Sequence, residues 1–154
     1  MPVVGKAADF LEKMEIPFEL LALSAHRTPR EVEEFATTAA TRGIKVIIAA
    51  AGMAAALPGV IAALTDLPVI GVPISSTLDG KDALLSIVQM PPGIPVATVG
   101  VNGALNAAIL AAEMMALSDE ALAAKLKAYK QGLKEKIVKA NEELSQVKYK
   151  FKVN

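Results

Sequence analysis

The feature that most constrains the fold is an apolar run at residues 44–50, which only Lys45 interrupts. Such a run is typical of a parallel strand that helices cover on both faces. Residues 68–72 and 95–99 are further apolar runs, and the segments between the three runs carry apolar residues at helical spacing. Strands that alternate with helices in this way predict a doubly wound parallel sheet in a three-layer α/β/α arrangement.

The chain before residue 44 follows the same alternation but opens with a helix. The spacing of apolar residues predicts helices over residues 3–14 and 28–42, with a strand over 18–23 between them. A doubly wound sheet normally opens with a strand that lies in its middle. We therefore expect that strand to be missing, so that the strands at 18–23 and 44–50 face a gap, and we interpret the chain as truncated at its start.

The only histidine, His26, lies beside Arg27 in a predicted strand-to-helix turn. A capping box marks the helix start, with Thr28 as N-cap, Pro29 as the first helical residue and Glu31 reaching back to the cap. Ligands bind at the carboxyl ends of strands in open α/β sheets, and a helix N-terminus with an arginine suits an anion such as a phosphate. A His-Arg pair in a loop is otherwise solvated surface, and the residues by themselves leave both interpretations open.

Further junctions follow the first one. Residues 51–59 are rich in Ala and Gly, which lets a ligand approach the backbone, although tight packing of helix on sheet is the simpler explanation of that stretch alone. A polar loop at residues 74–82 leads into a helix at 81–88. We expect Asn102 to be the N-cap of a helix that ends near Met115.

The C-terminal part predicts contact between copies of the chain. Residues 118–120 (Ser-Asp-Glu) start a long helix whose apolar residues keep 3–4 spacing as far as Leu144. At ~1.5 Å per residue this helix is about 40 Å long, more than a small domain can cover. We therefore expect residues 1–117 to form one domain, 118–147 a helix that packs on a neighbouring subunit, and 148–154 a flexible tail.

The composition excludes several classes of function. The chain has 16 basic and 16 acidic residues, and this zero net charge argues against a nucleic-acid or membrane-surface partner. With no cysteine and one histidine, we expect no disulfide and no metal site, and a cytoplasmic location is the default. The apolar stretch at residues 44–64 contains Gly52, Pro58 and Gly59, so we interpret it as a strand, a turn and a helix and not as a membrane span.

A set of short stretches carries a resemblance to a known family. They are residues 24–29 (Ser-Ala-His-Arg-Thr-Pro), 54–55 (Ala-Ala), 57–59 (Leu-Pro-Gly), 68–73 (Pro-Val-Ile-Gly-Val-Pro), 84–91 (Leu-Leu-Ser-Ile-Val-Gln-Met-Pro), 93–98 (Gly-Ile-Pro-Val-Ala-Thr) and 106–108 (Asn-Ala-Ala). In this order, and over about residues 3–115, the chain resembles the N5-carboxyaminoimidazole ribonucleotide mutases of purine biosynthesis.

The resemblance implies a flavodoxin-like catalytic domain at residues 1–117, assembled as a homo-octamer that works without metal, cofactor or ATP. The family moves a carboxyl group from the exocyclic amine of a ribonucleotide to its ring carbon, by decarboxylation and recapture of CO2 in a closed pocket. By the match, His26 shuttles a proton to and from the ring carbon, and Arg27 binds the ribotide phosphate. The match also implies that the 74–80 loop and residues 89–91 close the pocket. The residues that it implies bind the substrate together with Arg27 are Ser24, Ala51, Gly52, Ala54, Ala55 and Leu57.

Two departures from the family pattern leave alternatives open. The family's opening strand and its Gly-Ser-x-Ser-Asp loop have no match here, and Ala56 stands where many members have a histidine. Thr28 and Pro29 favour the mutases over relatives that carboxylate aminoimidazole ribonucleotide directly with CO2. Direct carboxylation is one alternative, and an inactive oligomeric protein that binds nucleotides is the other.

Overall fold

The computed structural model describes residues 2–153, so Met1 and Asn154, the outer ends of the expected domain and tail, lie outside the described residues. The chain divides into two compact units, Met1–Met115 and Ala116–Asn154. In chain order the elements are α1 (Gly5–Lys13), α2 (Pro29–Thr38), β1 (Ile47–Gly52), α3 (Leu57–Leu64), β2 (Val69–Ile74), the 3-10 turn η1 (Leu78–Gly80), α4 (Lys81–Val88), β3 (Ala97–Thr98), α5 (Ala104–Ala116) and α6 (Glu120–Gln146).

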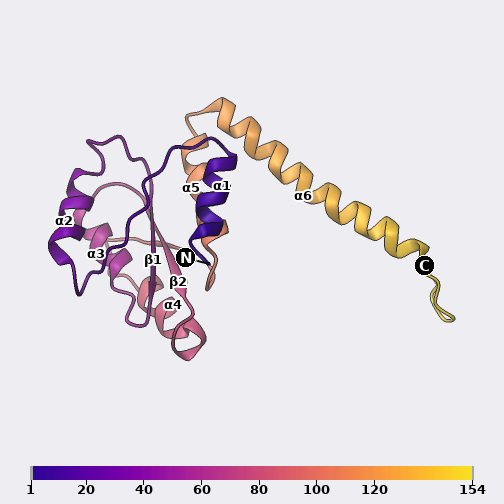
Figure 1. Cartoon of the computed structure of the whole chain (residues 1–154), viewed down its shortest axis with the longest axis horizontal. Coiled ribbons are helices and arrows are strands. Elements are labelled where there is room, and N and C mark those ends of the chain that lie inside the picture. The colour runs from indigo at the N-terminus through magenta and orange to yellow at the C-terminus, as the bar shows by residue number, and fades with distance from the viewer. Residues whose placement is uncertain (1, 154) are drawn as a thin grey trace. The chain divides into compact units, whose positions relative to one another are not determined.

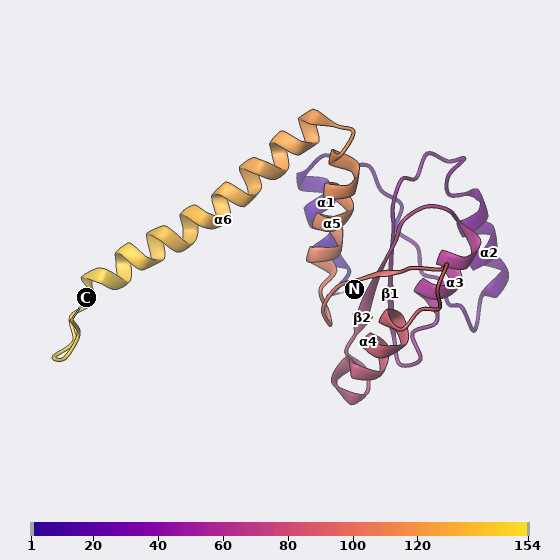
Figure 2. The same ribbon diagram turned by 180° about the vertical axis from the view of Figure 1, so that it is seen from behind.

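The first unit is built on a parallel sheet whose strand order, β1-β2-β3, follows the chain. Its register pairs Ile47 with Val69 and Ile70 with Ala97. α3 joins β1 to β2 and α4 joins β2 to β3, and each helix packs against both strands that it joins. α2 and α3 lie on one side of the sheet, and α1 and α5 lie on the other (Figure 1 and Figure 2). The predicted flavodoxin-like α/β fold is confirmed.

The middle strand, β2, lets a helix approach its backbone directly. Its residues 69–73 are all buried. A Cβ atom on Gly71 would lie 2.3 Å from Cγ2 of Ile87, a side chain of α4 that is 1% exposed. The missing side chain at Gly71 therefore sets how closely α4 packs on the sheet, which is a known reason for a glycine inside a strand.

A second part of the core lies between α2, α3 and β1, where one face of α2 is buried. The cluster consists of Val32, Ala36, Ala39, Ile47, Ala49, Ile61 and Val69. α2 ends at Thr38, a few residues earlier than expected, and turns follow to Gly43, which has φ +89. This left-handed residue ends the helical region as a C-terminal glycine does.

The strand predicted at residues 18–23 is wrong. Residues 16–24 are extended but belong to no sheet. Strand backbone groups need a neighbouring strand to pair with, and no strand within residues 2–153 lies beyond β1 in the sheet order. Consequently Phe18, Leu20 and Leu21 are 45%, 50% and 58% exposed.

The second unit contains α6. Its N-cap is Asp119, within the helix start predicted at residues 118–120, and the Asp119 carboxylate accepts a hydrogen bond from the Leu122 N–H (2.9 Å). At the other end, Nζ of Lys152 donates to the carbonyl oxygens of Leu144 (2.6 Å), Ser145 (3.0 Å) and Val147 (3.1 Å). A lysine that binds the last carbonyl groups satisfies acceptors that the helix leaves unpaired.

Candidate active site

The turn before α2 is closed by hydrogen bonds between Ser24 and Thr28. The Thr28 hydroxyl accepts from the Ser24 N–H (2.9 Å) and donates to the Ser24 carbonyl oxygen (3.1 Å), which also accepts from the Thr28 N–H (2.8 Å). Thr28 occupies the N-cap position and Pro29 the first turn of the helix, as predicted, but the Thr28 side chain makes no capping bond. The predicted capping box with Glu31 is therefore wrong, because Ser24 already uses the Thr28 hydroxyl.

This turn presents the side chains of His26 and Arg27 to solvent. The Ser24 hydroxyl oxygen accepts from the Arg27 N–H (3.2 Å), and Nε of Arg27 lies 3.5 Å from the same oxygen. Ser24 thus orients both the backbone and the side chain of Arg27. Because Ser24 contacts the guanidinium of Arg27 at Nε, the two Nη groups remain available to bind an anion. An imidazole in an exposed position, such as that of His26, is a side chain that can take up and release a proton.

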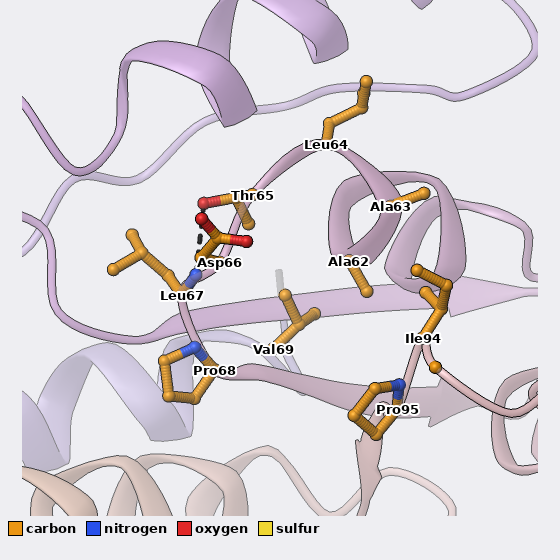
Figure 3. A pocket seen from close by; sticks show the side chains of 11 residues that line it. Ala62, Ala63, Leu64, Thr65, Asp66, Leu67, Pro68, Val69, Ile94 and Pro95 are labelled. Carbon is orange, nitrogen blue, oxygen red and sulfur yellow. Dashed lines mark hydrogen bonds between the residues drawn. The ribbon is translucent and has the colours of Figure 1, made fainter.

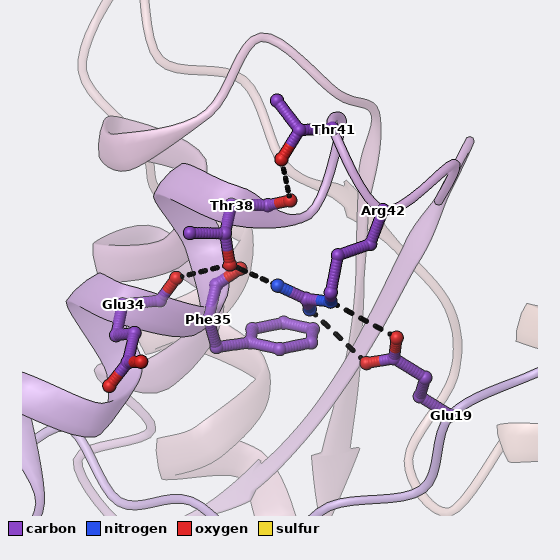
Figure 4. A network of polar contacts seen from close by, with 6 residues as sticks. All are labelled: Glu19, Glu34, Phe35, Thr38, Thr41 and Arg42. Atoms are coloured by element: carbon purple, nitrogen blue, oxygen red, sulfur yellow. Dashed lines mark hydrogen bonds and ion pairs between the residues drawn. The ribbon is translucent and has the colours of Figure 1, made fainter.

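Side chains, and not a strand ladder, hold the extended segment that leads into this turn (Figure 4). Nε and Nη2 of Arg42 donate to the two carboxylate oxygens of Glu19, each at 3.1 Å. Arg42 also donates to the Thr38 hydroxyl, and its guanidinium lies 5.2 Å from the centroid of the Phe35 ring. A bidentate pair fixes direction as well as distance. It therefore fastens the extended segment to the C-terminal end of α2.

The remaining predicted site residues lie where β1 leads into α3: Ala51 and Gly52 end the strand, Ala54 and Ala55 lie in the connection, and Leu57 begins the helix. The Ala55 N–H donates to the Gly52 carbonyl oxygen (3.0 Å) and closes a tight turn. Met53 and Ala55 have φ of 55° and 43°, in the left-handed region that residues with a side chain seldom adopt. Backbone in such regions is often found where a protein binds a ligand.

The loop after β2 lies against the end of β1. A Cβ atom on Gly52 would lie 3.2 Å from Cβ of Ser76. The predicted N-cap role of Asn102 is wrong, because α5 begins at Ala104 and the Asn102 side-chain oxygen accepts instead from the Ser75 N–H (3.0 Å). No local sequence pattern signals this bond, since its partners are 27 residues apart.

The carboxylate of Asp82 binds the loop after β2 near the point where that loop leads into α4. The Thr77 hydroxyl donates to the Asp82 carboxylate, and this bond holds the pKa of Asp82 below its ordinary value. The backbone N–H of Ala83 donates to the other carboxylate oxygen (2.9 Å) and acts in the same direction. Asp82 lies in the first turn of α4, where a negative charge is favourable.

The predicted site residues thus form two groups. Ser24, His26 and Arg27 share the turn before α2, while the residues at 51–57 span the end of β1, the turn that follows and the start of α3, with Ser76 beside Gly52. Among residues 2–153 no hydrogen bond or ion pair joins the two groups. Both groups follow extended chain and precede a helix, where backbone N–H groups are available to anions.

A hollow of ≈ 630 Å³ lies at the other edge of the sheet, where β2 and β3 begin (Figure 3). The end of α3, residues 65–68 and residues 93–95 line it. The Thr65 hydroxyl accepts from the Leu67 N–H (3.3 Å) at its rim. None of the predicted site residues lines this hollow, and parallel sheets bind ligands at the opposite, carboxyl ends of their strands.

Two negative findings concern residues 2–153. No three side chains of His, Cys, Asp or Glu gather there in a way that could hold a metal ion. No helix in this part of the chain combines the length and the apolar character needed to cross a bilayer.

Comparison with known proteins extends these observations. The AIR carboxylase family model matches residues 1–136. The N5-carboxyaminoimidazole ribonucleotide mutase of Pyrococcus abyssi is 58% identical over 135 residues, which are 87% of this chain and 78% of that protein. The phosphoribosylaminoimidazole carboxylase of Candida glabrata is 47% identical over 150 residues, 97% of this chain and 26% of that protein. The crystal structure of Treponema denticola PurE matches with a TM-score of 0.85 at 30% identity, over 95% of this chain and 92% of that one.

Proposed function

This chain belongs to the AIR carboxylase family, and from that premise we propose that it interconverts N5-carboxyaminoimidazole ribonucleotide and 4-carboxy-5-aminoimidazole ribonucleotide in purine biosynthesis. The observation that carries the proposal is the similarity to the Pyrococcus abyssi mutase, which spans most of both proteins. In this reaction the N–C bond to the carboxyl group breaks, CO2 is released, and the exocyclic nitrogen takes up a proton. The ring carbon then attacks CO2 and loses its own proton.

We assign the proton transfer at the ring carbon to His26. Its side chain is exposed in a turn whose backbone is fixed by Ser24 and Thr28. General acid–base catalysis of this kind contributes about 10²–10⁴-fold in rate. Among the described residues His26 is the single imidazole, so one side chain must both take and return the proton.

We assign phosphate binding to Arg27 and the lining of the pocket to Ser24, Ala51, Gly52, Ala54, Ala55 and Leu57. Ser24 supports this role because its hydroxyl orients Arg27. The strained turn at 53–55 supports it because small residues and tight backbone let a planar ring approach closely. No metal or cofactor takes part in this proposal.

The test follows the ultraviolet absorbance of 4-carboxy-5-aminoimidazole ribonucleotide in the presence of the chain. His26→Asn keeps a polar side chain of similar size and should lower kcat by about 10²-fold or more with an unchanged melting temperature. Arg27→Ala should raise KM about tenfold or more, since a hydrogen bond to a charged group is lost. Arg30→Ala, at an exposed arginine in the first turn of α2, is the matched control. Retained turnover in His26→Asn would refute the assigned role.

The alternative is direct carboxylation of aminoimidazole ribonucleotide by CO2, which the similarity to 26% of the Candida glabrata carboxylase does not favour. The two reactions differ in their substrates, so the same assay separates them. A rate that depends on added bicarbonate with aminoimidazole ribonucleotide favours the carboxylase. A rate with N5-carboxyaminoimidazole ribonucleotide that is independent of bicarbonate favours the mutase. Binding of the ribotide without turnover in either assay favours an inactive relative.

We further propose a cytoplasmic homo-octamer in which α6 packs on a neighbouring subunit. Support comes from one stripe of α6, where Leu133, Ile137 and Leu144 are 45%, 73% and 64% exposed. Full burial of an exposed side chain of this size is favourable by about 1.5–3 kcal/mol, and covering these three partly exposed side chains contributes a share of that value in proportion to their exposure. Size-exclusion chromatography with light scattering should give the mass of eight chains for the wild type and a smaller mass for Ile137→Asp. The control, Lys136→Asp, should keep the wild-type mass. A single-chain mass for the wild type would refute the assembly.

A further inference from the structure

Two loops at the carboxyl edge of the sheet are bonded to each other. We call residues 75–80, after β2, the 75–80 loop, and residues 99–103, after β3, the 99–103 loop. The Asn102 N–H donates to the carbonyl oxygen of Pro73 (2.8 Å), and Oδ1 of Asn102 accepts from the Ser75 N–H (3.0 Å). One residue thus binds the chain on both sides of the point where β2 ends.

The backbone of both loops is held in an uncommon conformation. Asn102 has φ 58°, and Leu78, Asp79 and Gly80 have φ of 46°, 55° and 81°. Left-handed conformations are uncommon for residues with a side chain; Asn and Asp adopt them more readily than most, whereas Leu78 needs its surroundings to enforce one. A Cβ atom on Gly80 would lie 2.6 Å from Cγ1 of Val101, so the far end of the 75–80 loop also rests on the 99–103 loop.

The fastened loop stands beside the proposed substrate site. Cβ of Ser76 is 3.2 Å from the position of a Cβ on Gly52, the last residue of β1. Ser75 and Ser76 are exposed, and their hydroxyl groups have no hydrogen-bond partner among residues 2–153. The position of these hydroxyls relative to the turn at 53–55 therefore depends on the bond between Asn102 and Ser75.

We propose that Asn102 is a positioning residue for the reaction: its side-chain oxygen holds the hydroxyls of Ser75 and Ser76 where they bind the hydroxyl or phosphate groups of the ribonucleotide. This inference rests on the proposed function. Asn102 acts on substrate binding and leaves the proton transfer to His26. Its loss therefore raises KM and changes kcat little, since it removes an interaction made equally in the ground state and the transition state.

Three variants separate the hydrogen bond from the backbone strain. Asn102→Gly removes the acceptor and relieves the left-handed conformation, Asn102→Ala removes the acceptor and keeps the strain, and Asn102→Asp keeps an oxygen acceptor in a residue that tolerates this conformation. We expect a threefold to tenfold rise in KM for Asn102→Gly, about the value of one hydrogen bond, with kcat within twofold. We expect Asn102→Asp to restore KM towards the wild-type value.

Amide hydrogen exchange tests the same bond without any substrate. The Ser75 N–H should exchange faster in Asn102→Gly than in the wild type and in Asn102→Asp. Equal exchange in all variants would overturn the proposal, as would a fall in melting temperature of Asn102→Gly with KM unchanged. If the wild type shows no turnover, the proposed function fails, while the exchange measurement still decides whether Asn102 holds the 75–80 loop.

Discussion

Replacement of Gly71 by alanine tests how the sheet and α4 are packed. The added Cβ would lie 2.3 Å from Cγ2 of Ile87 and 3.1 Å from Cγ1 of Val96. Carbon atoms in contact lie about 3.5–4.0 Å apart, so Ile87 must retreat by more than ~1 Å. Ile87 is 1% exposed and packs with Ala55 and Ala83, so its side chain has no free space into which it could move.

The change in the free energy of unfolding on Gly71→Ala is the sum of two opposing contributions. Overpacking of a filled core costs about 1–3 kcal/mol, and the rigid neighbour at Gly71 places this site near the upper value. Alanine also restricts the backbone of the unfolded chain more than glycine does, which stabilises the folded state by about 0.4–1 kcal/mol. We therefore expect Gly71→Ala to lower the free energy of unfolding by about 2 kcal/mol.

Urea denaturation measures this change as a lower midpoint with an unchanged m-value. Gly100→Ala, at a position with nothing within 4 Å of the new Cβ, is the control and should stay within about 0.5 kcal/mol of the wild type. Ile87→Ala alone should cost about 2–5 kcal/mol, but the double variant should be less unstable than the sum by about 2 kcal/mol. The reasoning is refuted if the two destabilisations add in the double variant, or if Gly71→Ala leaves the free energy of unfolding unchanged. Either result would mean that α4 does not pack as closely on β2 as described.

Three further predictions concern caps and charge. Asp119→Ala removes the hydrogen bond to the first turn of α6 and should cost about 1 kcal/mol, measured as an earlier loss of helix signal at 222 nm on heating. Gly43→Ala forces φ +89 on a residue with a side chain and should cost about 1 kcal/mol in urea, although its Cβ meets nothing within 4 Å. The lowered pKa of Asp82 stabilises the fold above the ordinary carboxyl pKa, and this stability is lost as pH falls through the lowered value. Thr77→Val should therefore flatten the acid limb of a stability–pH curve, and an unchanged limb would contradict the assigned cause.

Local patterns were enough to locate most of the first unit. The helix predicted at residues 81–88 coincides with α4, and the run at 44–50 overlaps β1, because buried parallel strands and amphipathic helices have distinct apolar patterns. The segment at 18–23 has the same apolar character as a strand. It is not one, because a strand exists only where a neighbour pairs with its backbone, and no local pattern shows that neighbour.

The turns that carry the proposed site were predictable from the sequence. The small residues at 51–57 and the turn at 24–28 lie between extended chain and helices, as expected. The hydroxyl of Thr28 and the amide of Asn102 were assigned to the nearest helix, because a cap is the common local partner of such side chains. Their actual partners, Ser24 and Ser75, depend on how the turn closes and on which loops the strand order places together.

Within residues 2–153 no strand pairs with the outer edge of β1, and this free edge has a consequence for how the protein behaves at high concentration. Unpaired N–H and C=O groups along an edge strand are a template for another chain, and Phe18, Leu20 and Leu21 add exposed apolar surface. The charges of the chain cancel, so no net repulsion keeps copies apart near neutral pH. A shift of pH away from neutrality restores that repulsion, and aggregation through this edge should then slow.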